Sequence, residues 1–243
     1  MEKPIASIIF THYGNNEARR KLGRASVISL YESVKHLPVE LIVVDNGGNL
    51  EDSIFFLKET DEGRITHYVR NSDNLFFSTA RNQALAISTG ENICIVDNDL
   101  IYEKGWLDRC LDILKKTKGQ KLFTSPMNII GMHQKYTWEI NIEGEKYKVN
   151  PFVGSNCWVM RREDYEVIGN FENHYISGSN YCRHYNKLGY AVVAIPGNLV
   201  RDVAIRAGIM QTVKKMKIEK QEEFIIKKKL LNGEEIILIR QRL

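Results

Sequence analysis

The first hundred residues alternate short, uninterrupted apolar segments with segments of helical periodicity. The apolar segments comprise residues 7–10, 41–44, 65–69 and 93–96, and the predicted helices span 17–37, 78–90 (with Ser78 as the N-cap) and 106–118. A strand without polar alternation has to be covered on both faces, and parallel strands need crossover segments, which helices supply. The pattern therefore predicts an α/β fold with a mostly parallel sheet flanked by helices.

The second half of the chain has a different pattern. We predict a hairpin over 135–150, a strand over 153–160, a helix over 179–188, a strand over 190–195, a helix over 209–231 and a short strand over 236–239. We expect one large domain over 1–203, made of the halves 1–120 and 121–203, followed by a lysine-rich extension over 204–243.

Size and composition exclude several classes of protein. A chain of 243 residues with 43% hydrophobic residues can bury a core without disulfides or a structural metal. Its four cysteines lie among apolar neighbours and form no C-x-x-C pair, which indicates buried free thiols. No apolar run approaches the ~20 residues of a membrane-spanning helix, and the first residues lack the apolar stretch of a signal peptide. We therefore expect a cytoplasmic protein.

The net charge of +4 is too small to identify a partner, but the charge is unevenly distributed. Residues 214–229 contain seven lysines against three glutamates. Such a run favours a solvated helix face, and contact with an anionic acceptor or surface is the alternative. Self-association into a homo-oligomer is left open.

Polar residues follow three of the predicted strands. They form the clusters 11–13 (Thr-His-Tyr), 45–46 (Asp-Asn) and 97–99 (Asp-Asn-Asp). Ligands bind at the carboxyl ends of the strands in parallel α/β sheets, so three clusters on one edge predict a single binding crevice. Asp97 and Asp99 follow the most apolar strand, and paired carboxylates suit a hard cation such as Mn²⁺ or Mg²⁺ that also binds phosphate. Aspartate is also common in turns, so D-x-D by itself is a weak signal.

The ordered motifs resemble those of a known family, the inverting glycosyltransferases of family 2, which have the GT-A fold. The resemblance rests on residues 7–13, 42–47, 74–82 and 96–99. The stretch 74–82 reads N-L-F-F-S-T-A-R-N and matches the family's N-L-G-F-S-x-A-R-N, except that Phe76 replaces the glycine. Residues 154–161 and 169–171 are similar to the acceptor-side segments of the family, and the resemblance covers roughly residues 4–202. It implies a GT-A sheet with an acceptor-side hairpin, a nucleotide- and metal-binding half over 1–120 and an acceptor half over 121–203.

The resemblance implies a role for each matching residue. The residues expected in the donor site are Thr11, His12, Tyr13, Asp45, Asn74, Arg81, Asp97 and Asn98. Asp45 would bond the base, Arg81 would lie near the ribose and diphosphate, and Asp97 would face the ribose or the metal. Asp99 would ligate Mn²⁺ or Mg²⁺ and so act in catalysis, because the cation offsets charge on the departing diphosphate.

The family usually has a further metal ligand, a histidine after the last strand of the sheet. The comparable stretch here is 198–202, where Asp202 stands near that place and would supply an oxygen ligand. Arg201 or Arg206 would alternatively pair with the diphosphate, because a guanidinium group fits phosphate oxygens. Surface charge on a loop is an equal alternative for these residues.

The most important departure from the family concerns the general base. The family places acidic residues in an E-D-x-D-x-C-x-R-like helix start, but the matching stretch 177–183 reads S-G-S-N-Y-C-R. Hydroxyl and amide groups do not act as general bases near neutral pH. Glu172 and His174 are the nearest titratable candidates. A retaining mechanism, or a domain that binds a nucleotide sugar without efficient transfer, are the alternatives.

The sequence therefore predicts a metal-dependent glycosyltransferase. It would move a sugar from a nucleotide diphosphate sugar, with a UDP-sugar preferred, to a hydroxyl group of a glycan or other acceptor. A catalytically impaired or regulatory nucleotide-sugar-binding module is the alternative. Nucleotidyl transfer is disfavoured, because residues 11–15 contain no lysine for a phosphate loop. Trp138 is interpreted as packing, with stacking on a sugar ring as the alternative.

Overall fold

The computed structural model describes residues 2–127, 138–151, 156–172, 177–197 and 199–203. These residues, as far as Asp202, form one compact unit. The extension 204–243, with its predicted helix and strand, lies outside the described residues, and so do His174 and Arg206.

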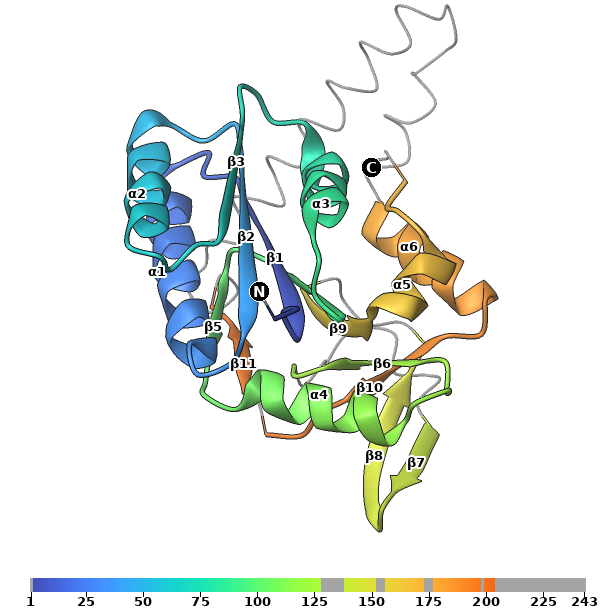
Figure 1. The fold of residues 1–243 in the computed structure, drawn as a ribbon. Helices are drawn as coiled ribbons and strands as arrows, with labels where there is room; N and C mark the ends of the chain where they lie inside the picture. The colour runs from blue at the N-terminus through green and yellow to red at the C-terminus, as the bar shows by residue number, and fades with distance from the viewer. Residues whose placement is uncertain (1, 128–137, 152–155, 173–176, 198, 204–243) are drawn as a thin grey trace, which may run out of the picture. The chain divides into compact units, whose positions relative to one another are not determined.

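Among the described residues, nine strands form one sheet in the order β3-β2-β1-β4-β9-β6-β10-β8-β7 (Figure 1). The strands are β1 (Ala6–His12), β2 (Val39–Asn46), β3 (His67–Asn71), β4 (Asn92–Val96), β6 (Leu122–Ser125), β7 (Trp138–Ile142), β8 (Glu145–Asn150), β9 (Cys157–Arg161) and β10 (Ala191–Ala194). Strands β1 to β4 are parallel to one another, whereas β9 runs antiparallel to β4 and β8 antiparallel to β10. A separate two-stranded ribbon pairs β5 (Leu100–Tyr102) with β11 (Val200–Asp202).

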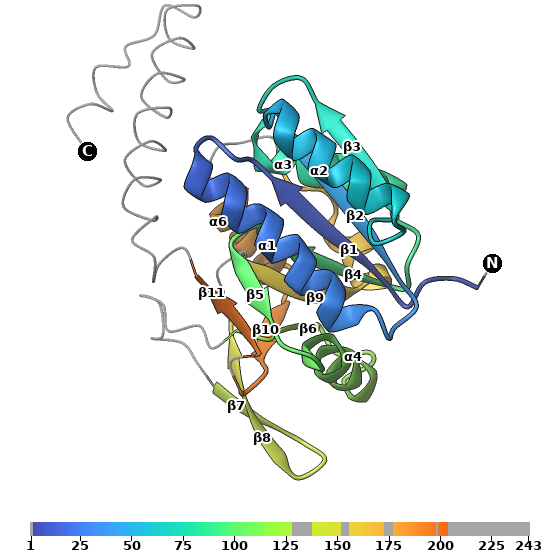
Figure 2. The same ribbon diagram turned by 90° about the vertical axis from the view of Figure 1, so that its left-hand side faces the viewer.

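Helices cover both faces of the sheet, as Figures 1 and 2 show. They are α1 (Glu17–Val34), α2 (Leu50–Asp61), α3 (Phe76–Ile87), α4 (Trp106–Lys116), α5 (Arg162–Ile168) and α6 (Ser177–Lys187). Ile8 and Phe10 of β1 pack into a core with α1, α2 and α4, whereas Ile9 packs into a second core with α3, α5 and α6. Burial on both faces explains why residues 8–10, 41–44 and 93–96 of β1, β2 and β4 are apolar without alternation.

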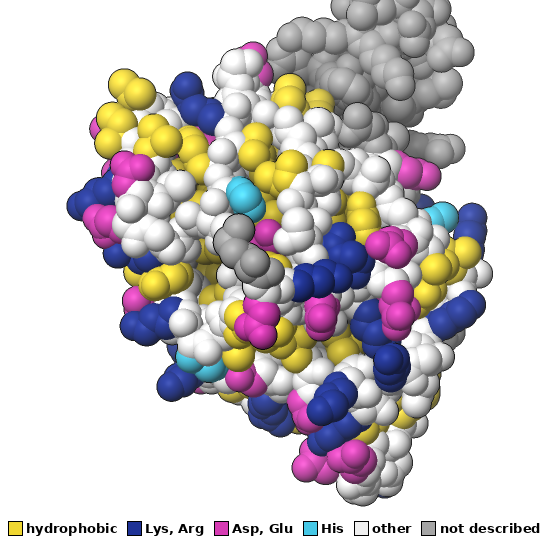
Figure 3. All heavy atoms as spheres, in the orientation of Figure 1, with side chains coloured by type: hydrophobic (Ala, Val, Ile, Leu, Met, Phe, Trp, Pro, Cys, Tyr) yellow, Lys and Arg dark blue, Asp and Glu magenta, His cyan; other side chains and the backbone are white. Residues whose placement is uncertain are grey.

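The predicted fold class is confirmed, and five of the described elements were not predicted: α2, α5, β5, β6 and β11. In α2 the apolar residues do not form one buried stripe, because Leu50, Ile54 and Leu57 are half or more exposed. Figure 3 shows apolar side chains gathered on the surface over α2. A mixed surface of this kind hides the helical periodicity on which sequence reasoning depends.

The prediction that Ser78 caps the helix over 78–90, which is α3 in the structure, is wrong. The helix begins at Phe76 with Leu75 at the N-cap position, and Ser78 is fully buried inside it. The reason is Asn74, whose side-chain oxygen accepts a hydrogen bond from the Phe76 N–H at 3.0 Å. One of the free donors at the helix start is therefore satisfied before the chain reaches Ser78.

All four cysteines are buried free thiols, as predicted. No helix in the described ranges has both the length and the apolar content needed to cross a membrane.

Glu40 stabilises the edge of the sheet opposite the polar strand ends. Its carboxylate accepts hydrogen bonds from the Ser7 hydroxyl, the Thr89 N–H and the Gly90 N–H. Burial by itself would raise the pKa of Glu40, but these donors outweigh burial, so its pKa is lowered. The ionised carboxylate therefore joins β1, β2 and the turn before β4.

Candidate active site

Three strand ends meet at one edge of the sheet. β1 lies between β2 and β4 and runs parallel to both. In register, His12 lies beside Asp45, and Phe10 lies beside Val96, which precedes the acidic motif. The three polar clusters therefore share the carboxyl edge of the sheet, where α/β proteins bind ligands.

Arg81 of α3 holds the first carboxylate of the acidic motif. It is only 1% exposed, and its guanidinium carbon lies 4.7 Å from the ring centroid of Phe77 and 5.3 Å from that of Phe171. Its Nη2 donates to Asp97 Oδ1 at 2.5 Å. Burial lowers the pKa of Arg81 and Asp97 opposes this effect, but a guanidinium group stays charged in proteins. A buried cation thus orients Asp97, whose side chain is 32% exposed.

Asp99 is held by a different helix. Arg19 of α1 donates from Nη1 to Asp99 Oδ2 at 3.1 Å, and the two side chains are only 10% and 12% exposed. Arg19 lies in the first turn of α1, where the helix dipole disfavours a cation unless an anion is close. The two carboxylates of the motif are therefore each paired with an arginine, and the arginines come from opposite faces of the sheet.

A buried chain of polar side chains links Asn98 to the outer helix α2. Asn98 Nδ2 lies 3.1 Å from His12 Nδ1, and His12 Nε2 lies 3.2 Å from Asp52 Oδ2. Arg24 completes the chain by donating from Nε to Asp52 Oδ1 at 2.8 Å. An amide nitrogen donates and cannot accept, so Nδ1 accepts and Nε2 carries the proton toward Asp52. Burial by itself would raise the pKa of Asp52, but His12 and Arg24 together have the larger, opposite effect. The pKa of Asp52 is therefore lowered, and this carboxylate is ionised.

Two glycines make room for the His12 ring, which is fully buried. A Cβ atom on Gly23 would lie 2.3 Å from His12 Nδ1, and a Cβ atom on Gly14 would lie 3.0 Å from His12 Nε2. The structure therefore places His12 inside the fold, where it orients Asn98. Its neighbours Thr11 and Tyr13 are partly exposed at the end of β1.

Asp45 also lies inside the fold. Its carboxylate accepts hydrogen bonds from the Gly48 N–H at 2.8 Å, the Ser53 hydroxyl at 2.9 Å and the Tyr68 hydroxyl at 3.1 Å. Burial, together with this carboxylate, raises the pKa of Tyr68 to about 12. Asp45 has no exposed surface and so joins β2, α2 and β3 at this edge of the sheet.

A network of side-chain amides shapes the loop before α3. Asn46 Nδ2 donates to Asn74 Oδ1 at 2.9 Å, and Asn46 Oδ1 accepts from the Leu75 N–H at 3.1 Å. Phe76 follows with a φ of 62°, a left-handed conformation that favours glycine. Phe76 therefore has a glycine-like backbone conformation, at the position where the family motif has a glycine.

Asp202 lies close to the acidic motif. β11 pairs with β5 so that Asp202 faces Leu100, the residue after Asp99. Asn156 bridges the two segments, because its backbone oxygen accepts from the Asp97 N–H at 2.9 Å and its Nδ2 lies 3.4 Å from Asp202 Oδ2.

Arg201 is not brought to these residues. Successive residues of a strand point to opposite faces, so Arg201 and Asp202 diverge. The Arg201 guanidinium pairs with Glu103 at 3.2 Å, and both side chains are about half exposed.

The segment around Phe171 is fastened to α3. Asn82 donates from Nδ2 to the Phe171 carbonyl at 2.8 Å and accepts from the Phe171 N–H at 3.0 Å. The Phe171 ring stacks on Tyr181 of α6 at 4.0 Å between centroids, and Tyr181 stacks on the buried Trp158. The 74–82 motif and the start of α6 are thereby held in a fixed relation.

This arrangement determines where Glu172 lies. Glu172 follows Phe171 directly, is exposed, and has Oε2 3.5 Å from Asn180 Nδ2. Asn180 belongs to the stretch in which the resembling family carries acidic residues. Of the two candidate bases, Glu172 is therefore the one that the structure describes. It directly follows Phe171, whose ring lies over the Arg81 guanidinium.

Sequence reasoning missed Arg19, Asp52 and Asn156. An arginine in the first turn of a helix was a usable signal, because the dipole disfavours a cation there and a nearby anion is implied. No comparable local feature marked Asp52 or Asn156. Their partners, His12 and Asp97, are distant in the sequence and are brought to them only by packing. Within the described ranges no three histidine, cysteine, aspartate or glutamate side chains are grouped as a complete metal site.

Comparison with known proteins was made by sequence family and by fold. Residues 16–169 match the family described as "Glycosyl transferase family 2". A comparison with curated proteins finds no sequence match.

Several solved structures share the fold. TarS 1–349 from S. aureus matches with a TM-score of 0.56 at 17% identity, over 78% of this chain and 57% of that one. The mannosyltransferase PcManGT from Pyrobaculum calidifontis, in complex with GDP-Man and Mn²⁺, matches with a TM-score of 0.60 at 17% identity, over 83% and 58%. GalNAc-T7 with UDP, GalNAc and Mn²⁺ matches with a TM-score of 0.60 at 13% identity, over 80% and 42%. The chain thus spans about half the length of these proteins, and at such identities the likeness concerns the fold alone.

Proposed function

Because its residues 16–169 match the family model, the chain belongs to glycosyl transferase family 2, and we propose that it transfers a sugar from a nucleotide diphosphate sugar to an acceptor hydroxyl. The predicted GT-A fold is confirmed by the solved structures that share it. One observation carries the proposal: Asp97 and Asp99 are held by separate arginines at the edge where three strands end.

The charges at this edge of the sheet suit a metal–diphosphate pair. Arg81 and Arg19 are buried and paired with carboxylates, so their role is to hold Asp97 and Asp99 in place. Asp97 and Asp99 are carboxylates, which match a divalent cation. We propose that Thr11, Tyr13, Asn74 and Asn98 line the donor site around them. For His12 and Asp45 the role that fits their full burial is to hold this edge in shape.

The residues present fit a metal that shares its ligands with the donor. Carboxylate oxygens are the donor atoms that Mn²⁺ and Mg²⁺ prefer, and Mg²⁺ in particular is commonly held by one or two carboxylates plus substrate phosphates. Asp99 and Asp97 would hold the ion. Asp202, which pairs with Leu100 directly after Asp99, is a further candidate ligand. When bound, the cation would offset negative charge on the departing diphosphate.

The nucleotide base is proposed from the ligands bound in structures of similar fold. Among the solved structures of similar fold, one of TarS 1–349 and one of GalNAc-T7 contain UDP, whereas PcManGT contains GDP-Man. We propose a UDP-sugar as donor, with a GDP-sugar as the competitor to be tested beside it. A glycan or another hydroxyl compound is the proposed acceptor.

Glu172 is proposed as the general base. Its carboxylate lies against Asn180, in the stretch from which the family's acidic residues are missing. A carboxylate there could take the proton of the attacking hydroxyl, which an amide cannot. The Asn82 clamp on Phe171 and the aromatic stack beneath it would keep Glu172 in place.

A second candidate function is a module that binds a nucleotide sugar without efficient transfer. The observation that favours it is Asn180, because an amide stands where the family has an acid. The two functions differ in one measurable respect, which is turnover of the donor.

Thermal unfolding with UDP- and GDP-sugars, each with and without Mn²⁺, tests donor binding. A ligand at one hundred times its Kd stabilises the folded state by about 2.7 kcal/mol. We expect Asp99→Asn to lose the Mn²⁺-dependent part of this effect, and the matched control Asp108→Asn, at a partly exposed position paired with His36, to keep it. A chain that no nucleotide sugar stabilises, or an Asp99→Asn variant that responds as the wild type does, would contradict the proposed site.

Release of free nucleotide from the stabilising donor then separates the two functions. Transfer or slow hydrolysis that is lost in Glu172→Gln supports the enzyme. Donor binding with no release of nucleotide, with water or with any glycan acceptor supplied, supports the binding module.

A further inference from the structure

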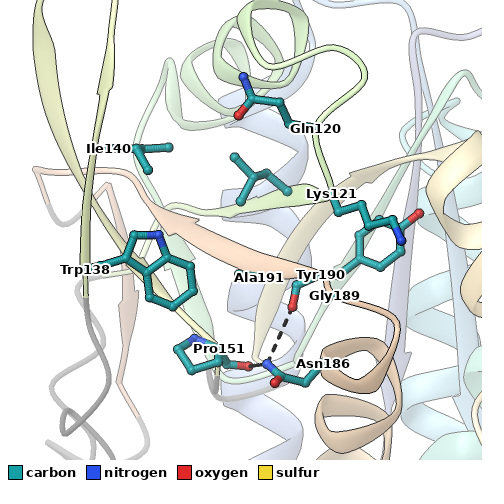
Figure 4. A pocket seen from close by; sticks show the side chains of 10 residues that line it. Gln120, Lys121, Trp138, Ile140, Pro151, Asn186, Gly189, Tyr190 and Ala191 are labelled. Atoms are coloured by element: carbon teal, nitrogen blue, oxygen red, sulfur yellow. Dashed lines mark hydrogen bonds between the residues drawn. The ribbon is translucent and has the colours of Figure 1, made fainter.

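A pocket lies beside strands of the sheet that are remote from the proposed donor site. It has a volume of about 710 Å³ and lies between the hairpin β7–β8, the carboxyl end of α6 and the amino ends of β6 and β10. We call it the hairpin pocket, and its walls are formed mainly by Trp138, Ile140, Pro151, Tyr190, Lys121 and Asn186 (Figure 4). This volume falls within the range of small-molecule sites.

The hairpin pocket is at the opposite edge of the sheet from the acidic motif. β9 is antiparallel to both β4 and β6, and β10 is parallel to β6. β6 and β10 therefore run in the same direction as β4, whose carboxyl end carries Asp97. The pocket adjoins their amino ends, so a ligand in it would not occupy the donor site.

Trp138 is the most informative residue of the pocket. It lies on β7, the last strand of the sheet, and is 47% exposed, whereas Trp106 and Trp158 are fully buried. Figure 4 shows its indole on one wall and Lys121 on the wall across the hollow. An indole left open beside Ile140 and Pro151 is an apolar surface that a ligand could cover, and the electron-rich face of the ring attracts C–H groups of positive polarity.

The polar groups of the pocket suit hydroxyl groups. Asn186 is fixed in place, because its Nδ2 donates to the Pro151 carbonyl at 3.0 Å and lies 3.5 Å from the Tyr190 carbonyl, which leaves its Oδ1 to accept from a ligand. Gln120 contributes a second side-chain amide, which can both donate and accept, as a sugar hydroxyl does. An open aromatic face beside a fixed acceptor and a second amide is a combination that suits a pyranose ring, which has apolar C–H faces and a polar rim.

The charge of the pocket argues for a neutral ligand. Of the lining residues, Lys121 is the charged one, and its Nζ already donates to the Leu188 carbonyl at 2.8 Å and lies 5.7 Å from the Tyr190 ring centroid. A phosphate or carboxylate ligand would normally be met by several unengaged cations. A neutral sugar needs none.

We propose that the hairpin pocket binds a neutral pyranose ring of a glycan chain, at a site separate from the site of transfer. Binding there requires neither a nucleotide nor a metal, so it goes beyond the proposed transfer function. A glycan held at this edge would be retained by the protein independently of donor turnover.

The test uses the full chain with EDTA and no nucleotide. The probes are neutral trisaccharides with different linkages: triacetylchitotriose, maltotriose, cellotriose and mannotriose. Trp106 and Trp158 are buried, so a saturable change in tryptophan fluorescence would report on Trp138. Calorimetry and saturation-transfer NMR then compare variants, because they do not depend on the indole itself.

We expect at least one trisaccharide to bind, Trp138→Ala to weaken binding about tenfold or more, and Trp138→Phe to retain part of it. Val167→Ala, at a position of α5 that is 63% exposed, is the matched control and should bind as the wild type does. Mn²⁺-dependent stabilisation by nucleotide sugars should be unchanged in Trp138→Ala, which separates this proposal from the proposed function.

Absence of saturable binding by every trisaccharide would overturn the proposal, and so would equal binding by Trp138→Ala and wild type. Self-association that Trp138→Ala abolishes, without saccharide binding, would instead identify this edge as an interface between copies of the chain.

Discussion

Gly23→Ala should destabilise this protein, although alanine usually stabilises a helix relative to glycine. Gly23 lies within α1, where intrinsic helix propensity favours alanine by about 1 kcal/mol. The added Cβ atom, however, would lie 2.3 Å from His12 Nδ1 and 2.4 Å from His12 Cε1. Atoms that are not bonded to each other repel strongly at such distances, so the imidazole ring would have to move.

The ring cannot move without losing its partners. It is hydrogen-bonded to Asn98 and Asp52, and it packs edge-to-face on Phe56 with 5.0 Å between centroids. The two hydrogen bonds contribute about 1 kcal/mol each, and overpacking of a core costs about 1–3 kcal/mol. After the gain in propensity, the free energy of unfolding should fall by about 2–4 kcal/mol.

Urea unfolding followed by circular dichroism measures this change, and Ala25→Gly is the matched control. Ala25 is exposed on the same helix, so this variant should lose about 1 kcal/mol through propensity alone. If propensity alone governed both positions, the double variant would be as stable as the wild type. The packing of His12 instead predicts a double variant that is less stable than either single one. A Gly23→Ala protein more stable than the wild type would refute this reasoning.

Three further substitutions test other parts of the structure. Phe76→Gly should raise the thermal midpoint, because a left-handed φ of 62° costs a non-glycine residue about 1–2 kcal/mol, whereas Phe77→Gly inside α3 should lower it. Glu40 has a pKa lowered from 4.5 in the folded state, so its contribution to stability is present above pH 4.5 and lost as pH falls through the lowered value. In urea unfolding, the wild type should therefore exceed Glu40→Gln in stability at neutral pH and converge with it in acid, and a constant difference would contradict this. Asn82→Ala removes both hydrogen bonds to Phe171 and should cost about 2 kcal/mol in the same assay; Asn82→Asp, which keeps the bond from the Phe171 N–H but turns a carboxylate oxygen toward the Phe171 carbonyl, should cost at least as much.

The strand pattern of the first half was predictable because its physical cause is local. Apart from Ser7, residues 7–10, 41–44 and 93–96 are all apolar, and they lie in β1, β2 and β4, which are neighbouring interior strands of the sheet. The ends of these strands were predictable for the same reason, since polar residues directly follow them. The position of the acidic motif at the carboxyl edge therefore follows from the sequence alone.

The departures arose where packing overrides local pattern. The helix predicted from Ser78 begins at Phe76, because Asn74 binds the first N–H group. His12 was expected to line the donor site, but two glycines, Gly14 and Gly23, open a space for it in the interior. In the sequence Gly14 looks like part of the turn with Asn15 and Asn16, and Gly23 like an isolated glycine within a helix, so neither indicated this space.

The sequence by itself therefore determined the fold class, the apolar strands of the first half, the edge at which polar residues collect, and the family to which the protein belongs. Those properties follow from hydrophobic periodicity and from motifs a few residues long. The partner of each carboxylate was decided only by the tertiary structure: Asp99 pairs with Arg19, 80 residues earlier, and Asp97 pairs with Arg81 on another helix. An ion pair depends on which side chains the packed helices bring within a few ångströms of each other, and no local propensity encodes that distance.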